Sequence, residues 1–446
     1  KESVLSPCFM IIEVIMEVMI PFFMSYLIDN GITVGNMGYI VRMGSFLIVL
    51  ALLTILLGTL SGVYAARAAT GLAANLRYDV FSNIQRFSFS NLDKFSTPSL
   101  VTRLTTDINN VLMAYQAIIR QAVRSVAMIA FALTAAFRTN AQVAMVFVAA
   151  IPVLGVGLFS IILNVHPIFV MALKTYDRLN NVVQENLRGI RVVKSFVRED
   201  VENEKFRRIS EEIYTYFNKA QKRVALNAPL IQFCTYSSMI MISWISARLI
   251  VVGSMTTGEL MSMFSYVMQI LMNLMMMSIV FVMIMISRTS AIRIAEVLNE
   301  QPDLKNPENP LMEVGDGSIS FKNVSFSYVG DKDKLCLKDV NLDIKSGETI
   351  GIIGGTGSSK STLVQLIPRL YDATEGEVFV GGENVKNYDI KTLRNQVSVV
   401  LQHNVLFSGT IKENLRWGNP EASDSEIEHA CRLAQAHDFI KSFPKG

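Results

Sequence analysis

Six apolar stretches, each long enough to cross a lipid bilayer, constrain the fold of this chain more than any other feature. At 1.5 Å per residue, a helix of about 20 residues spans the roughly 30 Å of hydrocarbon in a membrane. Of the residues, 51% are hydrophobic and only 18% are charged, against about 25% charged in soluble domains. We therefore predict an α-helical membrane domain of six transmembrane helices over residues 1–300. The stretches lie near residues 4–28, 41–66, 112–137, 141–165, 225–252 and 259–286.

The connections between these stretches predict their orientation. Residues 67–107 and 166–223 together contain seventeen Lys or Arg, whereas the short turns 29–42, 138–140 and 253–259 contain two. Basic residues of membrane proteins concentrate on the cytoplasmic side. We therefore expect a multi-pass protein of the cell membrane, with both long connections and both chain ends in the cytoplasm. Apolar residues recur at helical spacing in the long connections. The membrane helices are thus expected to continue well into the cytoplasm, either as rods that carry a displacement or only as solvated stalks.

Charged pairs interrupt two of the apolar stretches. Glu13 and Glu17 lie one helical turn apart in the first stretch, and Arg120 and Arg124 lie one turn apart in the third, at similar depth. A charge at the centre of the bilayer costs about 3 kcal/mol unless it is paired or faces water. We hypothesise a contact between the glutamates and the arginines. The alternative is that all four residues line an aqueous cavity unpaired.

The last stretch is rich in methionine, with ten methionines between residues 255 and 285. Thioether side chains either adapt to different apolar ligands or simply fill space. The four cysteines are scattered without CxxC spacing, which favours a reducing compartment or burial in lipid over a disulfide framework or a zinc site. The net charge of +3 gives no basis for nucleic-acid binding.

The composition changes after residue 300. Residues 301–316 contain three prolines and few apolar side chains, so we interpret them as a linker. Residues 317–446 alternate short β-rich runs with glycine turns, which is typical of an α/β domain. We predict strands over 319–326, 340–344 and 377–380, a buried strand over 348–353, and a helix over 363–370.

A glycine-rich turn joins that buried strand to the helix. Strand, glycine-rich turn and a helix that opens with Lys-Ser-Thr are the parts of a phosphate-binding loop in their required order. Backbone amides of such a loop point at an anion, Lys360 reaches the β and γ phosphates, and Ser361 ligates Mg²⁺. An unrelated glycine-rich turn is the alternative. The residues of the turn are Gly354, Gly355, Thr356, Gly357, Ser358, Ser359, Lys360, Ser361 and Thr362.

Ser359 departs from the usual motif, which has glycine immediately before the lysine. If this position requires a positive φ or a close approach of phosphate, the Cβ of Ser359 costs about 1 kcal/mol or more. We therefore expect nucleotide binding to be weakened.

Together these features resemble the ATP-binding cassette exporters, and specifically bacterial multidrug-type exporters, over essentially the whole chain. In that family an aromatic residue ahead of the cassette stacks on adenine, and Tyr328 occupies that position. In the family a strand also ends in a glutamine that coordinates the metal and couples the two domains, and residues 397–403 resemble that strand, with Gln402 as the glutamine. The resemblance implies an ATP and Mg²⁺ site in which Lys360 and Gln402 take part in hydrolysis. The matching segments are 93–107, 180–196, 324–328, 397–403 and 407–415.

Three motifs of the family are not found after Gln402: the LSGGQ-like signature, the apolar strand that ends in Asp-Glu, and the switch histidine. His403, His429 and His437 do not replace that histidine, and we interpret them as surface residues. Either the sequence is incomplete or this fragment cannot hydrolyse ATP. We expect the former, because half a cassette would leave its α/β core without covering elements.

The resemblance implies a half-transporter that pairs with a second half, as a homodimer or heterodimer. Its expected function is ATP-driven export of amphipathic small molecules across the cytoplasmic membrane by alternating access. Two alternatives stay open. The first is an ATP-binding half with a weak site in a heterodimeric transporter of lipids or peptides. The second is a nucleotide-regulated channel or receptor.

Overall fold

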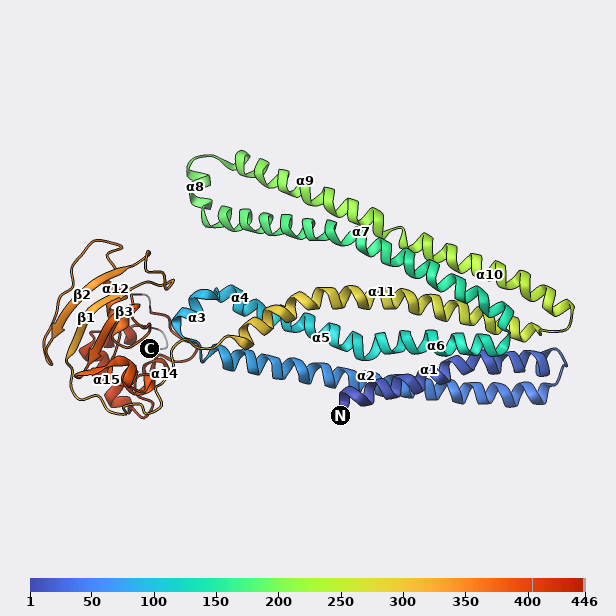
Figure 1. Cartoon of the computed structure of the whole chain (residues 1–446), viewed down its shortest axis with the longest axis horizontal. Coiled ribbons are helices and arrows are strands. Elements are labelled where there is room, and N and C mark those ends of the chain that lie inside the picture. The colour runs from blue at the N-terminus through green and yellow to red at the C-terminus, as the bar shows by residue number, and fades with distance from the viewer. Residues whose placement is uncertain (403, 444–446) are drawn as a thin grey trace. The chain divides into compact units, whose positions relative to one another are not determined.

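The computed structural model describes residues 1–402 and 404–443, and the chain divides into two compact units (Figure 1). The first unit contains Lys1–Phe87 and Asn91–Pro302, and the second contains Ser88–Ser90 and Asp303–Gly446. The chain therefore passes to the second unit after Pro302, within the segment interpreted as a linker. Each unit has its own buried apolar core.

The first unit consists of helices. Six of its helical stretches are long and apolar enough to cross a membrane, which confirms the predicted number of spans within the described residues. The helices are α1 (Glu2–Leu27), η1 (Ile28–Ile32), α2 (Met37–Ile84), α3 (Phe89–Lys94), α4 (Thr97–Thr102), η2 (Arg103–Asp107), α5 (Ile108–Gln116), η3 (Ala117–Ala122), α6 (Val123–Thr139), α7 (Ala141–Arg188), α8 (Ile190–Ser195), α9 (Glu199–Val224), α10 (Asn227–Val251) and α11 (Thr257–Asn299).

Several of these helices are much longer than a membrane is thick. Helices α2 and α7 have 48 residues each, or about 72 Å at 1.5 Å per residue. The expectation that the membrane helices continue beyond the bilayer is therefore confirmed, and their role as rods that carry a displacement stays a prediction. Helix α7 lies beside α9 and α10, to which the short α8 connects it (Figure 1).

Polar caps fix where the long helices begin. Asn36 accepts a hydrogen bond from the amide of Tyr39 at the start of α2, and Asn140 does the same for α7. Thr256 and Glu259 form a reciprocal capping box at the start of α11. Each cap satisfies amides that have no partner within the helix.

The core of the first unit lies where five helices meet. Met10 of α1, Met128 of α6, Phe147 of α7, Ile242 of α10 and Tyr266 of α11 are all at most 2% exposed and belong to one apolar cluster. Each fills space between neighbouring helices, so the cluster holds together segments that are far apart in the sequence.

The second unit contains a four-stranded antiparallel sheet in the order β2-β1-β3-β4. Ile319 pairs with Ile344 on one side and with Val380 on the other. The predicted strands at 319–326, 340–344 and 377–380 are confirmed. The elements are β1 (Ile319–Phe326), β2 (Leu337–Ile344), α12 (Lys360–Leu366), β3 (Glu375–Val380), β4 (Glu383–Asn384), η4 (Val385–Asn387), α13 (Ile390–Gln396), α14 (Ile411–Leu415), α15 (Asp424–Leu433) and α16 (His437–Lys441).

The predicted buried strand over 348–353 is wrong, and so is the strand expected to end at Gln402. Neither segment is paired into the sheet of the described residues, and Ile353 and Val400 are 98% and 91% exposed. A central strand of an α/β sheet is stable only when neighbours satisfy its backbone on both edges. The helix predicted over 363–370 ends earlier than expected, at Leu366 of α12.

Candidate functional site

The glycine-rich turn leads directly into α12, as the sequence predicts. Ser359 is the residue before the helix and has φ 59° and ψ 23°, in the left-handed region. Gly357 also has a positive φ of 84°. A Cβ placed on Gly355 or Gly357 would meet nothing within 4 Å, so the space beside both glycines is open. The loop therefore has room for an anionic ligand.

The Lys360 side chain folds back over this turn. Its Nζ donates to the carbonyl oxygens of Gly354 and Gly355, each at 2.8 Å, and to Ser358 Oγ at 3.2 Å. Ser358 Oγ in turn donates to the Gly355 oxygen at 2.8 Å. The ammonium group is thus held at the turn by neutral acceptors. A phosphate oxygen is a stronger acceptor for it because phosphate is anionic, so that both partners of the hydrogen bond would be ionised.

Tyr328 lies against the helix that follows the turn. Its hydroxyl is 2.9 Å from Thr362 Oγ1 and donates to Gln365 Oε1 at 3.2 Å. The ring meets Phe326 and Tyr371 edge-on, with centroids 4.9 and 5.2 Å away, and the residue is 43% exposed. The structure therefore brings Tyr328 to α12, with part of the ring available. Its stacking on adenine stays a prediction.

The two candidate magnesium ligands supply the right kind of atom. Ser361 carries an exposed hydroxyl in the first turn of α12, and Gln402 is an exposed amide on an irregular segment. Neutral oxygen donors of this kind, completed by phosphate oxygens and water, suit Mg²⁺. No hydrogen bond joins Gln402 to the turn among the described residues, so the shared metal role of the two side chains stays a prediction.

Two of the three histidines that were interpreted as surface residues lie within the described residues. His429 is exposed on α15, and His437 is half-buried at the start of α16. His403 lies outside the described residues.

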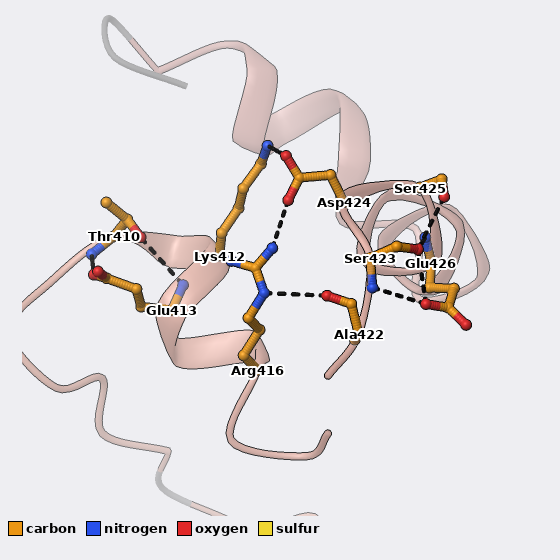
Figure 2. Close-up of polar contacts among 9 residues, drawn as sticks. All are labelled: Thr410, Lys412, Glu413, Arg416, Ala422, Ser423, Asp424, Ser425 and Glu426. Carbon is orange, nitrogen blue, oxygen red and sulfur yellow. Dashed lines mark hydrogen bonds and ion pairs between the residues drawn. The ribbon is translucent and has the colours of Figure 1, made fainter. Parts of the chain in front are cut away.

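Sequence reasoning missed a polar clamp in the segment after Gln402 (Figure 2). Asp424 accepts from Lys412 Nζ at 2.7 Å and from Arg416 Nη2 at 2.6 Å, and so fastens α15 to α14. The hydrogen bond from Lys412, followed by that from Arg416, holds the pKa of Asp424 below its ordinary value. Two capping boxes flank this clamp. They begin at Thr410 and Ser423, and their Thr-x-x-Glu and Ser-x-x-Glu spacing could have been read from the sequence.

The hypothesised contact between the glutamates of the first apolar stretch and the arginines of the third forms in part. Arg124 Nη1 donates to Glu13 Oε1 at 2.5 Å, and Nη2 donates to Glu17 Oε2 at 2.6 Å. Arg120 makes neither contact among the described residues; its guanidinium lies beside Gly62, where an added Cβ would be 3.5 Å from Arg120 Cζ.

The reason for this difference is local helix geometry. Arg120 belongs to the π-helical segment η3, and Arg124 to the α-helix that follows. Residues four apart share a face in an α-helix, but the i→i+5 hydrogen bonds of a π-helix shift that register.

Comparison with protein-family models gives two matches. Residues 4–290 match the ABC transporter transmembrane region, and residues 337–445 match the ABC transporter model, which contains the glycine-rich turn. The two matches follow each other along the chain in the same order as its helical and sheet-containing units.

Several curated proteins are similar to this chain. An uncharacterized ABC transporter ATP-binding protein of Bacillus subtilis is 32% identical over 437 residues, which is 98% of this chain and 76% of that protein. A putative multidrug export ATP-binding/permease protein of Staphylococcus aureus is 35% identical over 59% of this chain and 46% of its own length. An ATP-dependent lipid A-core flippase of Desulfotalea psychrophila is 29% identical over 85% of this chain and 66% of its own length.

Proposed function

Because this chain belongs to the ABC transporter family, we propose that it is one half of a dimeric exporter that uses ATP to move amphipathic small molecules out of the cell. The observation that carries the proposal is the joining of two features in one chain. Six helices are long enough to cross a membrane, and the loop that ends in Lys360 leads into the helix that Tyr328 contacts.

The residues at the turn have separate roles in this proposal. Lys360 exchanges its bonds to the Gly354 and Gly355 carbonyls for bonds to phosphate oxygens, which are the stronger acceptors. Tyr328 offers the exposed part of its ring to the adenine base. Ser361 and Gln402 would hold Mg²⁺, which would neutralise charge on the phosphates. Phosphoryl transfer then depends on positioning and electrostatic stabilisation rather than on a covalent step.

The long helices convert ATP binding into movement of the membrane helices. Helices such as α2 and α7 are continuous beyond a bilayer's thickness, so a displacement at one end is transmitted along a rigid element. Closure of the nucleotide-binding domains of two halves would favour the outward-open state, and hydrolysis would restore the inward-open state. In this proposal the nucleotide-binding domain and both chain ends lie in the cytoplasm, on the side that carries most basic connections.

An amphipathic substrate fits both the relatives and the composition of α11. Two relatives are named for multidrug export and for lipid A-core flipping. Methionines in α11 such as Met261, Met268 and Met272 are more than 40% exposed in the chain. Flexible thioethers suit a surface that must accept different apolar groups.

The experiment that tests this function is ATP-dependent uptake of a fluorescent amphipathic dye into inside-out membrane vesicles. We expect uptake with ATP but not with ADP, and a loss of at least tenfold in the Lys360→Ala variant. Lys391→Ala, which removes an exposed lysine of α13, is the matched control and should leave uptake unchanged. Equal uptake in wild type and Lys360→Ala would reject ATP-driven export. Passive equilibration of the dye on ATP addition would indicate a nucleotide-regulated channel.

A second candidate function is favoured by the backbone at Ser359. A left-handed conformation at a residue with a Cβ weakens the loop's preference for its binding shape. This half would then bind ATP but contribute little turnover in a heterodimer. ATP binding with no hydrolysis at this site, in a dimer that still transports, is the result that would select this candidate.

A further inference from the structure

Helix α7 runs beside α9 and then beside α10 (Figure 1), and a small pocket lies where α9 gives way to α10. Three of its lining residues belong to α7, one to the last turn of α9, and one to the turn before α10. The pocket has a volume of about 400 Å³ and is lined by Ser160, Ile161, Asn164, Arg223 and Leu226. Polar and apolar side chains therefore share one gap between helices.

Close contacts bound this pocket on both sides along α7. A Cβ added to Gly157 would lie 2.6 Å from Leu230 Cδ2, so α7 and α10 touch there. Beyond the other side of the pocket, the rings of Phe169 and Phe217 meet edge-on with centroids 6.0 Å apart, which joins α7 to α9. The pocket is therefore a defined gap between two places of helix contact.

The pocket lies at the edge of the membrane spans. The apolar stretch of α7 ends near residue 165, and that of α10 begins near residue 225. Asn164 and Arg223 therefore lie at the boundary between hydrocarbon and the headgroup layer. In the proposed orientation this boundary is the cytoplasmic one, because Arg223 ends the basic connection 166–223.

Basic side chains gather at the end of α9. Lys219, Lys222 and Arg223 are exposed, and Lys219 and Arg223 share one face of the helix because they are four residues apart. Arg178 and Lys205, which lie further from the membrane, each pair with a glutamate. Among the described residues, the three basic residues at the end of α9 form no ion pair. Their charge is therefore not neutralised by the chain itself.

The sequence on either side of the pocket explains this lack of partners. Residues 108–176 and 213–258 contain no Asp or Glu. Helix α10 and the part of α7 that lines the pocket consequently offer no carboxylate. Basic residues at the cytoplasmic boundary of a membrane attract anionic headgroups. The local charge therefore favours an anionic occupant.

Arg223 is already turned toward α7. Its Nη1 donates to the backbone oxygen of Asn164 at 2.9 Å. A guanidinium carries several further N–H donors in a fixed plane, and within the described part of the chain those of Arg223 have no partner. The backbone oxygen thus positions the guanidinium, and its remaining donors match the spacing of phosphate oxygens.

We propose that this pocket binds the headgroup of an anionic phospholipid, with Arg223 and Lys219 as its phosphate-binding residues. The phosphate accepts hydrogen bonds from the remaining donors of Arg223, and Ile161 and Leu226 offer apolar surface to the first part of the acyl chains. Basic pockets between membrane helices at the cytoplasmic side bind acidic headgroups in this way. A second copy of this chain would have to bring a carboxylate to the site, whereas the membrane supplies phosphate at this depth. The inference goes beyond the proposed function, because it does not depend on the use of ATP.

The test is native mass spectrometry of the purified protein in detergent, titrated with phosphatidylglycerol. We would compare the double variant Lys219→Gln/Arg223→Gln with Lys174→Gln/Arg178→Gln, an exposed pair of α7 with the same residue types and spacing. Lys174 follows Asn164 by ten residues, which places the control pair about 15 Å or more from the pocket along α7. Thermal unfolding without added lipid checks that both variants are folded, as the exposure of the four side chains predicts.

We expect the control to bind phosphatidylglycerol as wild type does and the double variant to bind it at least fivefold more weakly. Phosphatidylcholine, whose headgroup has no net charge, should bind wild type at least threefold more weakly than phosphatidylglycerol. Ser160→Phe, which fills the pocket without changing a charge, should weaken binding of phosphatidylglycerol at least threefold. This variant separates the pocket from a general effect of surface charge.

Equal affinity of wild type and the double variant for phosphatidylglycerol overturns the inference. The same result together with a smaller fraction of dimers would assign the pocket to a second copy of the chain. Unchanged binding by Ser160→Phe, or equal binding of the two lipids, also overturns it. Inorganic phosphate that displaces the lipid at equal concentration would show a site for the free ion only, and so contradicts a lipid site. Dye uptake that does not depend on ATP would reject the proposed function and leave this inference standing.

Discussion

Replacing Ser359 with glycine should tighten ATP binding about fivefold. Ser359 has φ 59° and ψ 23°, a conformation that costs an L-residue about 1–2 kcal/mol. Glycine adopts it without that cost, although its greater freedom in the unbound loop offsets about 0.5–1 kcal/mol. The net gain is about 1 kcal/mol, which corresponds to about fivefold in the dissociation constant.

The assay is titration of the purified protein with a fluorescent ATP analogue, followed by competition with unlabelled ATP. Because substitution changes the preference of the free loop for its binding shape, the gain should appear in affinity rather than in the number of sites. The fluorescence of the fully bound analogue should therefore be the same in wild type and in Ser359→Gly.

Ser359→Ala is the control that isolates the backbone effect. Alanine removes the hydroxyl but keeps the Cβ, so the left-handed conformation remains unfavourable and the affinity should stay within twofold of wild type. Equal tightening by alanine and glycine would refute the reasoning, since the hydroxyl and not the backbone would then be responsible. Weaker binding by the glycine variant would refute it more directly.

Three further predictions follow from other contacts. Arg124→Gln removes the guanidinium and leaves Glu13 buried beside an uncharged partner. It should lower the free energy of unfolding in detergent by about 2 kcal/mol, which thermal unfolding would measure. This loss is smaller than the about 3–5 kcal/mol expected when a fully buried ion pair is broken. Gly58→Ala should also destabilise, because its Cβ would lie 3.0 Å from the Glu13 carboxylate, whereas Gly44→Ala meets nothing within 4 Å and should unfold at or above the wild-type temperature. The pKa of Asp424 is lowered in the folded state from its ordinary value of 3.8. The contribution of the ionised Asp424 to the stability of the fold is therefore present above pH 3.8 and is lost as the pH falls below it. Asp424→Asn should flatten the dependence of the thermal midpoint on pH between about 5 and 3.

The membrane half of the fold was predictable because its information is local. A run of apolar residues near 41–66 identifies a span whatever its neighbours are, since the membrane itself supplies the apolar surroundings. The polar side chains that begin the helices, such as Asn36 and Asn140, also act within a few residues of their position. What periodicity does not reveal is which helix meets which, and the joining of Arg103 to Glu296 across 193 residues needed the structure.

The charge cluster shows where a local rule fails. The i,i+4 rule places Arg120 and Arg124 on one face, and the sequence contains no proline or glycine near them to suggest otherwise. The π-helical turns of η3 nevertheless separate the two side chains, and Arg124 rather than Arg120 donates hydrogen bonds to both glutamates. A change of helix register arises from packing along the whole helix, so a window of four residues cannot report it.

The glycine-rich turn, in contrast, has a shape that does not depend on the strand that was expected to lead into it. Residues 348–353 pair with no strand among those described, yet Ser358, Ser359 and Lys360 adopt a closed turn. Hydrogen bonds within the turn account for this. Lys360 Nζ donates to two backbone carbonyl oxygens, and Ser358 Oγ donates to one of the same two oxygens. A loop shaped by its own short-range bonds keeps its conformation even where longer-range pairing is lacking. The residue that most restricts it is then Ser359, the position at which the local conformation and the side chain disagree.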